Sequence, residues 1–171
     1  MKHFGIAAAA LIVSFAQARA DDGCDKFAWP LAHERALFAA AGNPAVKAGE
    51  ALSTAPKGAF VLALQPNTEA ATLAAYAMPP ERKPKAEHWF GGAVRFPAAD
   101  KPGIYQVTLS EEAWMDIVQD GRYAYTVGHT GRGDCPGLRK SVRLELGAAP
   151  FVLQISGAPA DKISVAISRT E

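Results

Sequence analysis

The chain has 171 residues, with 18 basic and 17 acidic side chains and a formal net charge of +1. A near-neutral chain lacks the electrostatic footprint of a nucleic-acid-binding protein, and nothing in it resembles a basic amphipathic helix for a membrane surface. A length of this order suits one domain with one core. We therefore expect no nucleic-acid partner and a single folded domain.

Residues 1–20 have the organisation of a secretory signal peptide. A basic start at Lys2 precedes an apolar run over 4–16, and Ala18-Arg19-Ala20 fits an A-x-A cleavage site. The apolar run is shorter than the roughly 20 residues that a bilayer requires, so we expect no membrane span. Cleavage removes two basic residues and leaves 16 against 17 acidic ones. The sequence predicts a mature domain at 21–171 that is periplasmic or secreted.

The chain contains two cysteines, Cys24 and Cys135, and both lie in the mature part. In an oxidising compartment an even pair predicts a disulfide, which here would join the new N-terminus to a glycine-rich loop. Closing so long a loop is worth roughly 4 to 5 kcal/mol in the chain-entropy model. The alternative is a reactive thiol or a metal ligand. We interpret the nearby triplet Arg132-Gly133-Asp134 as part of a turn and not as an integrin-binding motif.

The first regular element expected in the mature chain is a short helix at about 30–41. Pro30 suits a first helical turn, and Gly42-Asn43-Pro44 is a stop signal. Leu31, Leu37 and Phe38 are predicted to lay this helix against a sheet.

The remainder of the chain has the period-two alternation of half-buried strands. The clearest case follows the Pro102-Gly103 turn, where Tyr105, Val107 and Leu109 share one face of an extended segment. Adjacent glycines at Gly91 and Gly92 indicate a bulge or a close backbone approach. The strands expected are 59–64, 70–77 (with a helix as the alternative), 88–96, 105–110, 122–127, 141–146, 151–156 and 162–168, and the segments 78–86 and 128–137 are expected to be loops.

Short strands at this spacing predict an all-β fold. We expect an antiparallel β-sandwich or jelly roll of about eight strands with a short N-terminal helix. The order G-x-Y-x-V-x-L-S, A-W-x-D, a cysteine loop and a final V-L-Q-I-S-G resembles the pre-peptidase C-terminal type of β-sandwich of exported bacterial proteins, over about residues 60–168. The resemblance is one of pattern and implies a fold.

A second resemblance concerns the start of the mature chain. The segment Cys24–Leu31, with sequence CDKFAWPL, is similar to the start of small exported bacterial proteins, some of which bear the name homogentisate dioxygenase. This resemblance implies a non-haem iron dioxygenase as an alternative function.

Catalytic chemistry has little support in the spacing of titratable residues. Ser110 or Ser53 with a histidine lacks the G-x-S-x-G signature of a hydrolase. If a metal is bound, His88 and His129 are the candidate ligands, but no H-x-H or H-E-x-x-H spacing presents two ligands from one element. We therefore predict neither a metal site nor a cofactor.

A binding surface is the better functional candidate. In the segment Trp114–Val118, alternation places Met115 and Ile117 inward and leaves Trp114 and Asp116 together on the other face. The predicted ligand-binding residues are Trp114, Asp116, Trp89, Tyr123 and Tyr125. The alternative is that these aromatic side chains fill the core.

Three functions remain open at this stage. The first is a non-catalytic binding or accessory module of the cell envelope, whose partner is a small molecule, a glycan or an envelope protein. The second is a metal-dependent enzyme, and the third is a structural partner subunit. The first is favoured because acid-base or metal chemistry requires clustered titratable residues that the spacing does not provide.

Overall fold

The computed structural model describes residues 23–56, 58–70 and 89–170 of the chain. The predicted signal peptide at 1–20, the predicted loop at 78–86, His88 and all but the first residue of the predicted strand at 70–77 lie outside these ranges. The described residues form the 3₁₀ helix η1 (Cys24–Lys26), the helix α1 (Ala32–Ala39) and the strands β1 (Ala45–Lys47), β2 (Ala59–Ala63), β3 (Gln65–Pro66), β4 (Phe90–Phe96), β5 (Gly103–Leu109), β6 (Trp114–Gln119), β7 (Arg122–Tyr123), β8 (Thr126–Gly131), β9 (Lys140–Leu146), β10 (Phe151–Ala158) and β11 (Lys162–Arg169).

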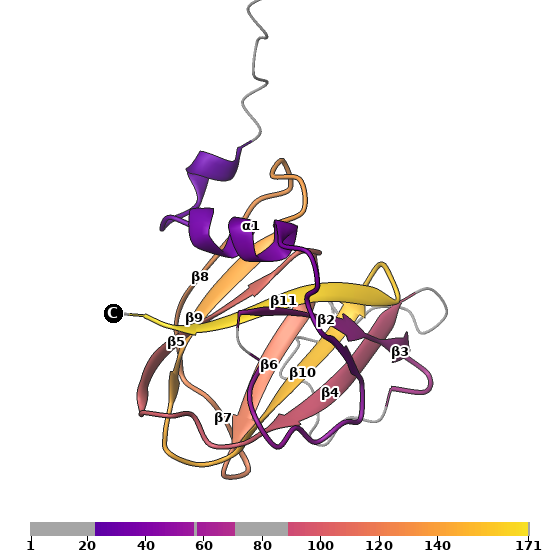
Figure 1. Ribbon diagram of the computed structural model, residues 1–171, viewed down its shortest axis with the longest axis vertical. Coiled ribbons are helices and arrows are strands. Elements are labelled where there is room, and N and C mark those ends of the chain that lie inside the picture. Colours follow the sequence, from indigo (N-terminus) through magenta and orange to yellow (C-terminus); the bar gives the residue numbers. More distant parts are fainter. Residues whose placement is uncertain (1–22, 57, 71–88, 171) are drawn as a thin grey trace, which may run out of the picture.

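The strands form two sheets that pack face to face (Figure 1). One sheet has six strands in the order β1-β2-β11-β5-β9-β8, and the other has five in the order β3-β4-β10-β6-β7. All strand pairs are antiparallel except β1 with β2, which is parallel. The prediction of an antiparallel all-β sandwich with one short N-terminal helix is confirmed.

The core lies between the two sheets and is built from the inward residues of alternating strands. Val107 and Leu109 of β5 are fully buried, as the alternation predicts. The rings of Phe96 and Phe151 stack with centroids 4.9 Å apart. Other members of this single apolar cluster are Phe60, Leu62, Val94, Ile117, Leu144, Leu153, Ile155, Ile163 and Val165.

The predicted number of strands, about eight, is too low, since the described residues contain eleven. The strands β1, β3 and β7 have only two or three residues, which is too short for an alternating pattern to appear. The predicted strand at 122–127 is wrong as a single element. Its first residues form β7 in the five-stranded sheet, and from Thr126 the chain continues as β8 in the six-stranded sheet.

The glycine pair in β4 marks a close approach, as predicted. A Cβ atom at Gly92 would collide with the side chain of Ala48. The register of the neighbouring strand shifts between Ile155 and Ala158, opposite this part of β4, which is the irregularity of a bulge.

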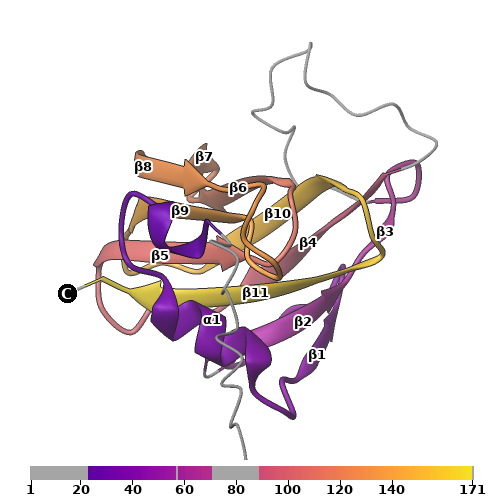
Figure 2. The ribbon, with the colours of Figure 1, turned by 90° about the horizontal axis from the view of Figure 1, so that it is seen from above.

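The N-terminal elements cover the outer face of the six-stranded sheet. α1 lies across this sheet and packs on β11 and β2 (Figure 2). Leu31 is buried there, and Leu37 and Phe38 are both half-buried, as expected for residues that lay the helix against the sheet. The one buried residue within α1 itself is Glu34, which the sequence did not indicate. Of the helices in the part of the chain described, none is long and apolar enough to cross a membrane.

Candidate functional site

An open groove of about 1120 Å³ lies at the end of the sandwich where the two sheets meet. The six-stranded sheet contributes the end of β8 and the start of β9, and the five-stranded sheet contributes the start of β6 and the end of β10. The turn between β5 and β6 completes it. The lining residues used below are Trp89, Glu111, Trp114, His129, Arg132, Arg139, Lys140 and Ser156.

Trp114 is the predicted site residue whose position the structure fixes most tightly. Met115 and Ile117 are buried, and Trp114 and Asp116 are half-buried on the opposite face of β6, as the alternation predicts. The indole Nε1 of Trp114 donates a hydrogen bond to Asp116 Oδ1 at 3.3 Å. Lys140 Nζ lies 5.1 Å from the centroid of the indole ring and donates to the carbonyl of Ala113 at 3.2 Å. Trp114 is therefore an oriented wall of the groove, with a cation over its ring.

Trp89 offers the more open aromatic surface. Its side chain is 36% exposed, and it lines the same groove as Trp114 although the two residues are far apart in the sequence. The carbonyl of Trp89 accepts a hydrogen bond from the backbone N–H of Asn67 at 2.8 Å, which holds the start of β4 in place. The structure thus brings two of the predicted aromatic residues to one concave surface.

Tyr123 and Tyr125 do not belong to this groove. Tyr123 lies in β7 opposite Val118, near the other end of β6, and Tyr125 is 69% exposed between β7 and β8. The alternative that these tyrosines fill the core is wrong, because both are exposed. Alternation suggested a common patch with Trp114, but the chain changes sheets after Tyr123, so the two tyrosines are not carried by one strand.

Several polar groups of the groove have no partner within the described residues. The guanidinium of half-buried Arg139 and the carboxylate of half-buried Glu111 make no hydrogen bond or ion pair with the described chain. The hydroxyl of Ser156, which is 2% exposed and pairs across the sheet with Trp114, also has no hydrogen-bond partner there. A buried polar atom without a partner is costly, so such groups indicate a place where a ligand or water supplies the missing bond.

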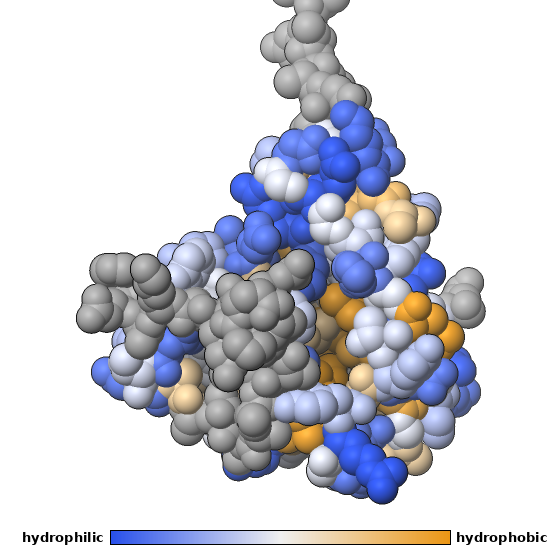
Figure 3. All heavy atoms as spheres, turned by 180° about the vertical axis from the view of Figure 1, so that it is seen from behind, coloured by the Kyte–Doolittle hydropathy of each residue, from blue (hydrophilic) through white to orange (hydrophobic). Residues whose placement is uncertain are grey.

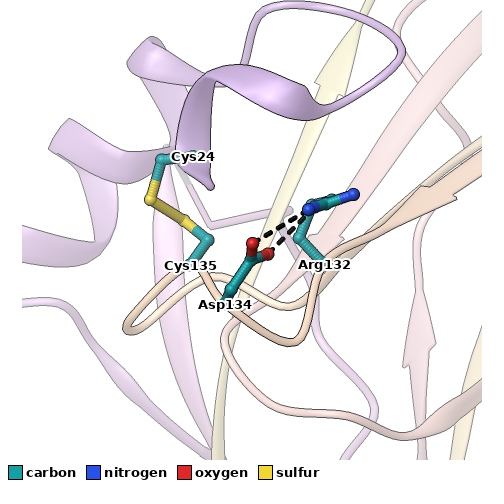
Figure 4. Close-up of polar contacts among 4 residues, drawn as sticks. All are labelled: Cys24, Arg132, Asp134 and Cys135. Carbon is teal, nitrogen blue, oxygen red and sulfur yellow. Dashed lines mark hydrogen bonds and ion pairs between the residues drawn. A yellow bond between two sulfur atoms is a disulfide. The ribbon is translucent and has the colours of Figure 1, made fainter. Parts of the chain in front are cut away.

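The wall formed by β8, β9 and their connecting loop is anchored to the N-terminus. Cys24 of η1 and Cys135 of the loop form the predicted disulfide (Figure 4). Arg132 donates two hydrogen bonds to the carboxylate of Asp134, from Nε at 3.0 Å and from an Nη atom at 2.9 Å. These bonds hold the pKa of the Asp134 carboxyl below its ordinary value of 3.8.

The Arg132-Gly133-Asp134 triplet is part of this loop and serves its internal structure. The guanidinium and the carboxylate face one another in a bidentate pair, as Figure 4 shows. The triplet is thus bound to itself, which agrees with its interpretation as part of a turn.

The residues considered for catalysis are dispersed. His129 lines the groove and is exposed, and Ser110 accepts a hydrogen bond through its side chain from the backbone of Ser164 at 2.8 Å. A buried carboxylate outside these candidates, Glu34 of α1, accepts a hydrogen bond from Gln106 Nε2 at 2.7 Å. Within residues 23–56, 58–70 and 89–170, no three side chains of His, Cys, Asp or Glu form a group able to hold a metal ion.

Glu111, Arg139 and Ser156 are the groove residues that sequence reasoning missed. Glu111 and Arg139 lie just outside strands, Ser156 lies within β10, and none belongs to a recognisable motif. The available signal was the position of Arg139 and Lys140 at the start of a clear strand, close in sequence to the cysteine loop. That signal does not identify the opposite wall of the groove, which β6 and β10 supply.

The distribution of hydrophobic surface is uneven. Viewed from behind, hydrophobic atoms are visible in the middle of the molecule and toward one side, and the end that carries the N-terminal elements is mostly hydrophilic (Figure 3).

Comparisons with known proteins do not assign a family. No family model, no curated protein and no solved structure matches the chain.

Proposed function

We propose that the protein is an exported, non-catalytic binding module of the cell envelope and that its groove binds an oligosaccharide. The proposal places the mature protein, residues 21–171, in the periplasm or outside the cell. A signal-peptide pattern and a disulfide are both typical of exported proteins. The pattern resemblance to pre-peptidase C-terminal β-sandwiches of exported bacterial proteins is consistent with this location.

The observation that carries the proposal is the meeting of two tryptophans and several unpartnered polar groups in one groove. Sugars present apolar C–H faces, which pack on aromatic rings, and hydroxyl groups, which require hydrogen-bond donors and acceptors. Trp89 provides an exposed ring, and Trp114 provides an oriented ring in the lining of the same groove. Arg139 and Glu111, which both line the groove, supply a donor and an acceptor.

The charges of the groove favour an uncharged or mixed-charge ligand over a strongly anionic one. Lys140 already lies over the Trp114 ring, and Arg132 is paired with Asp134. The guanidinium of Arg139 is balanced by the carboxylates of Glu111 and Glu112 among the lining residues. Ser156 adds a neutral hydroxyl at the base of Trp114. A ligand with many hydroxyl groups can form hydrogen bonds with these charged and neutral polar side chains.

The test is a glycan-array screen of the oxidised mature protein, followed by calorimetry with each oligosaccharide that binds. The substitution Trp89→Ala is expected to weaken the affinity by about tenfold or more, because a central aromatic contact is removed. The substitution Trp114→Ala is expected to have a similar effect. Tyr125→Ala is the matched control, since it removes an exposed aromatic ring outside the groove and should leave the affinity unchanged.

Two results would overturn the proposal. One is a glycan whose affinity is the same for Trp89→Ala, Trp114→Ala and the unmodified protein, which would place its site elsewhere. The other is an array with no bound glycan, which would favour the role of a structural partner subunit.

A further inference from the structure

We infer that the Cys24–Cys135 disulfide is a reversible redox restraint on one wall of the groove. The groove therefore has high affinity for its ligand only in the oxidised protein. This inference rests on the proposed function, because it concerns the affinity of the same groove. It assigns the disulfide a regulatory role in addition to a structural one.

The cysteine loop connects two parts of the groove wall. Residues 129–133 and Arg139 with Lys140 line the groove, and Cys135 lies between these two groups in the sequence. A displacement of the loop at Cys135 is therefore transmitted directly to the lining residues on both of its sides.

The N-terminal segment packs against the buried side of the cysteine loop. Cys135 and Leu138 are fully buried, and they pack with Leu31, Phe27 and Trp29 of the N-terminal segment. Gly23 has a positive φ of 70°, and a Cβ atom there would collide with the carboxyl group of Asp134. The backbone next to Cys24 is thus in close contact with the loop residue that pairs with Arg132 (Figure 4).

The N-terminal segment has further attachments to the sheet, at residues that follow Cys24 in the chain. The backbone N–H of Ala28 donates to Thr130 Oγ1 at 3.0 Å, and Trp29 Nε1 donates to Ser141 Oγ at 3.3 Å. Glu34 accepts from Gln106 at 2.7 Å. These contacts do not involve Cys24, so α1 stays on the sheet when the disulfide is reduced, and the loosening is confined to η1 and the loop.

Reduction of the disulfide requires a dithiol reductant. The different exposure of the two cysteines decides which sulfur the reductant attacks first. Cys24 is partly exposed and Cys135 is buried, so a reductant thiolate attacks Cys24 Sγ and Cys135 leaves as a thiolate that takes up a proton. The second thiol of the reductant then attacks the mixed disulfide, forms the disulfide of the reductant and releases the Cys24 thiol. Two electrons and two protons pass from the dithiol to the protein.

A cleft beside the disulfide gives the reductant access. It has a volume of about 590 Å³ and is lined by both cysteines together with apolar side chains of the N-terminal segment, among them Phe27, Trp29 and Leu31.

The experiment compares amide hydrogen exchange and ligand affinity in the oxidised and dithiothreitol-reduced mature protein. Three amides report on the loop, because each donates a defined hydrogen bond: Arg132 to Arg139, Leu138 to Cys135 and Arg139 to Leu109. The amide of Val61, which donates to Pro44, is the distant control. Reduction is expected to accelerate exchange at the reporter amides, to leave Val61 unchanged and to weaken oligosaccharide binding by about tenfold.

The double substitution Cys24→Ser with Cys135→Ser should behave as the reduced protein and should not respond to dithiothreitol. If this variant does not fold, reduction of the folded wild-type protein still decides the matter. If exchange at the three reporter amides is the same in the oxidised and reduced protein, the disulfide does not restrain the loop, whatever the ligand. Faster exchange with unchanged affinity for a glycan that depends on Trp89 would overturn its link to binding. If no glycan binds the oxidised protein, the proposed function fails. The exchange data then test by themselves whether the disulfide restrains the loop.

Discussion

The central strands of the six-stranded sheet are covered on both faces, and the two covered layers differ in chemistry. Its inner face meets the other sheet through apolar residues such as Leu62 and Val165. Its outer face, beneath the N-terminal elements, holds Glu34, Gln106 and a pair of hydroxyl groups from Thr108 and Ser141 that lie 2.9 Å apart. An apolar layer depends on volume and shape, whereas a polar layer depends on the direction of each hydrogen bond.

The difference suggests separate tasks for the two layers. The apolar core supplies most of the free energy of folding. The polar layer specifies one position for the N-terminal segment, since each group in it requires its partner. Gln106 shows this most clearly, because its amide nitrogen donates to Glu34 and its amide oxygen accepts from Arg143 Nε at 3.0 Å. Arg143 in turn lies 4.3 Å from the centroid of the Trp29 ring.

The largest effect is expected in the apolar layer. Phe60→Ala removes a fully buried ring from the centre of the core and should lower the free energy of unfolding by about 4 kcal/mol. Chemical denaturation followed by circular dichroism measures this loss. Val127→Ala, at an exposed apolar position, is the control and should change stability by less than about 0.5 kcal/mol. Similar values for both variants would contradict the position of the core.

A smaller effect, but a more specific one, is expected in the polar layer. Glu34→Ala should cost about 2 kcal/mol of unfolding free energy, because the buried Gln106 amide loses its acceptor. In a double-mutant cycle with Gln106→Ala, the coupling energy should be about 1 kcal/mol. His33→Ala, the exposed neighbour of Glu34 on the same helix, is the matched control. Strict additivity of the Glu34 and Gln106 substitutions would refute the hydrogen bond between them.

The smallest effect concerns an exposed ion pair outside both layers. Because Arg132 stabilises the ionised form of Asp134, the pKa of Asp134 should lie below 3.8 in the folded protein. The contribution to stability is then present above the pKa of the unfolded chain and is lost as the pH falls through the folded value. Carboxyl chemical shifts followed by NMR titration measure it. Arg132→Gln should return the midpoint toward 3.8, and an unchanged midpoint would exclude the pairing in solution.

The apolar layer could be predicted from the sequence, and the polar layer could not. Alternation identified the strands that contain Val107, Ile155 and Ile163 because one face of each is apolar. The burial of Glu34 had no such signal, since the same residue on an uncovered helix would be solvated. Its environment depends on Gln106, which is 72 residues away in the chain.

The groove was only partly predictable for a related reason. Trp114 and Asp116 follow from alternation within one strand, and the Cys24–Cys135 bond follows from cysteine count and compartment. The strand β8 was missed from Gly128 onward because an exposed edge strand with glycines has no apolar face to mark it. The grouping of Trp89 with Arg139 and Ser156 depends on how three separate strands meet, which pattern within one segment does not encode.

The order of the strands also has a consequence for how the chain folds as it is made. β10 lies between β4 and β6 in one sheet, and β11 lies between β2 and β5 in the other. Both strands follow their neighbours in the sequence and take interior positions, so each of these four neighbours has an unpaired edge until β10 and β11 have been made. A chain without residues 151–169 cannot complete either sheet, so the earlier strands have to persist as incomplete sheets until these residues have been made.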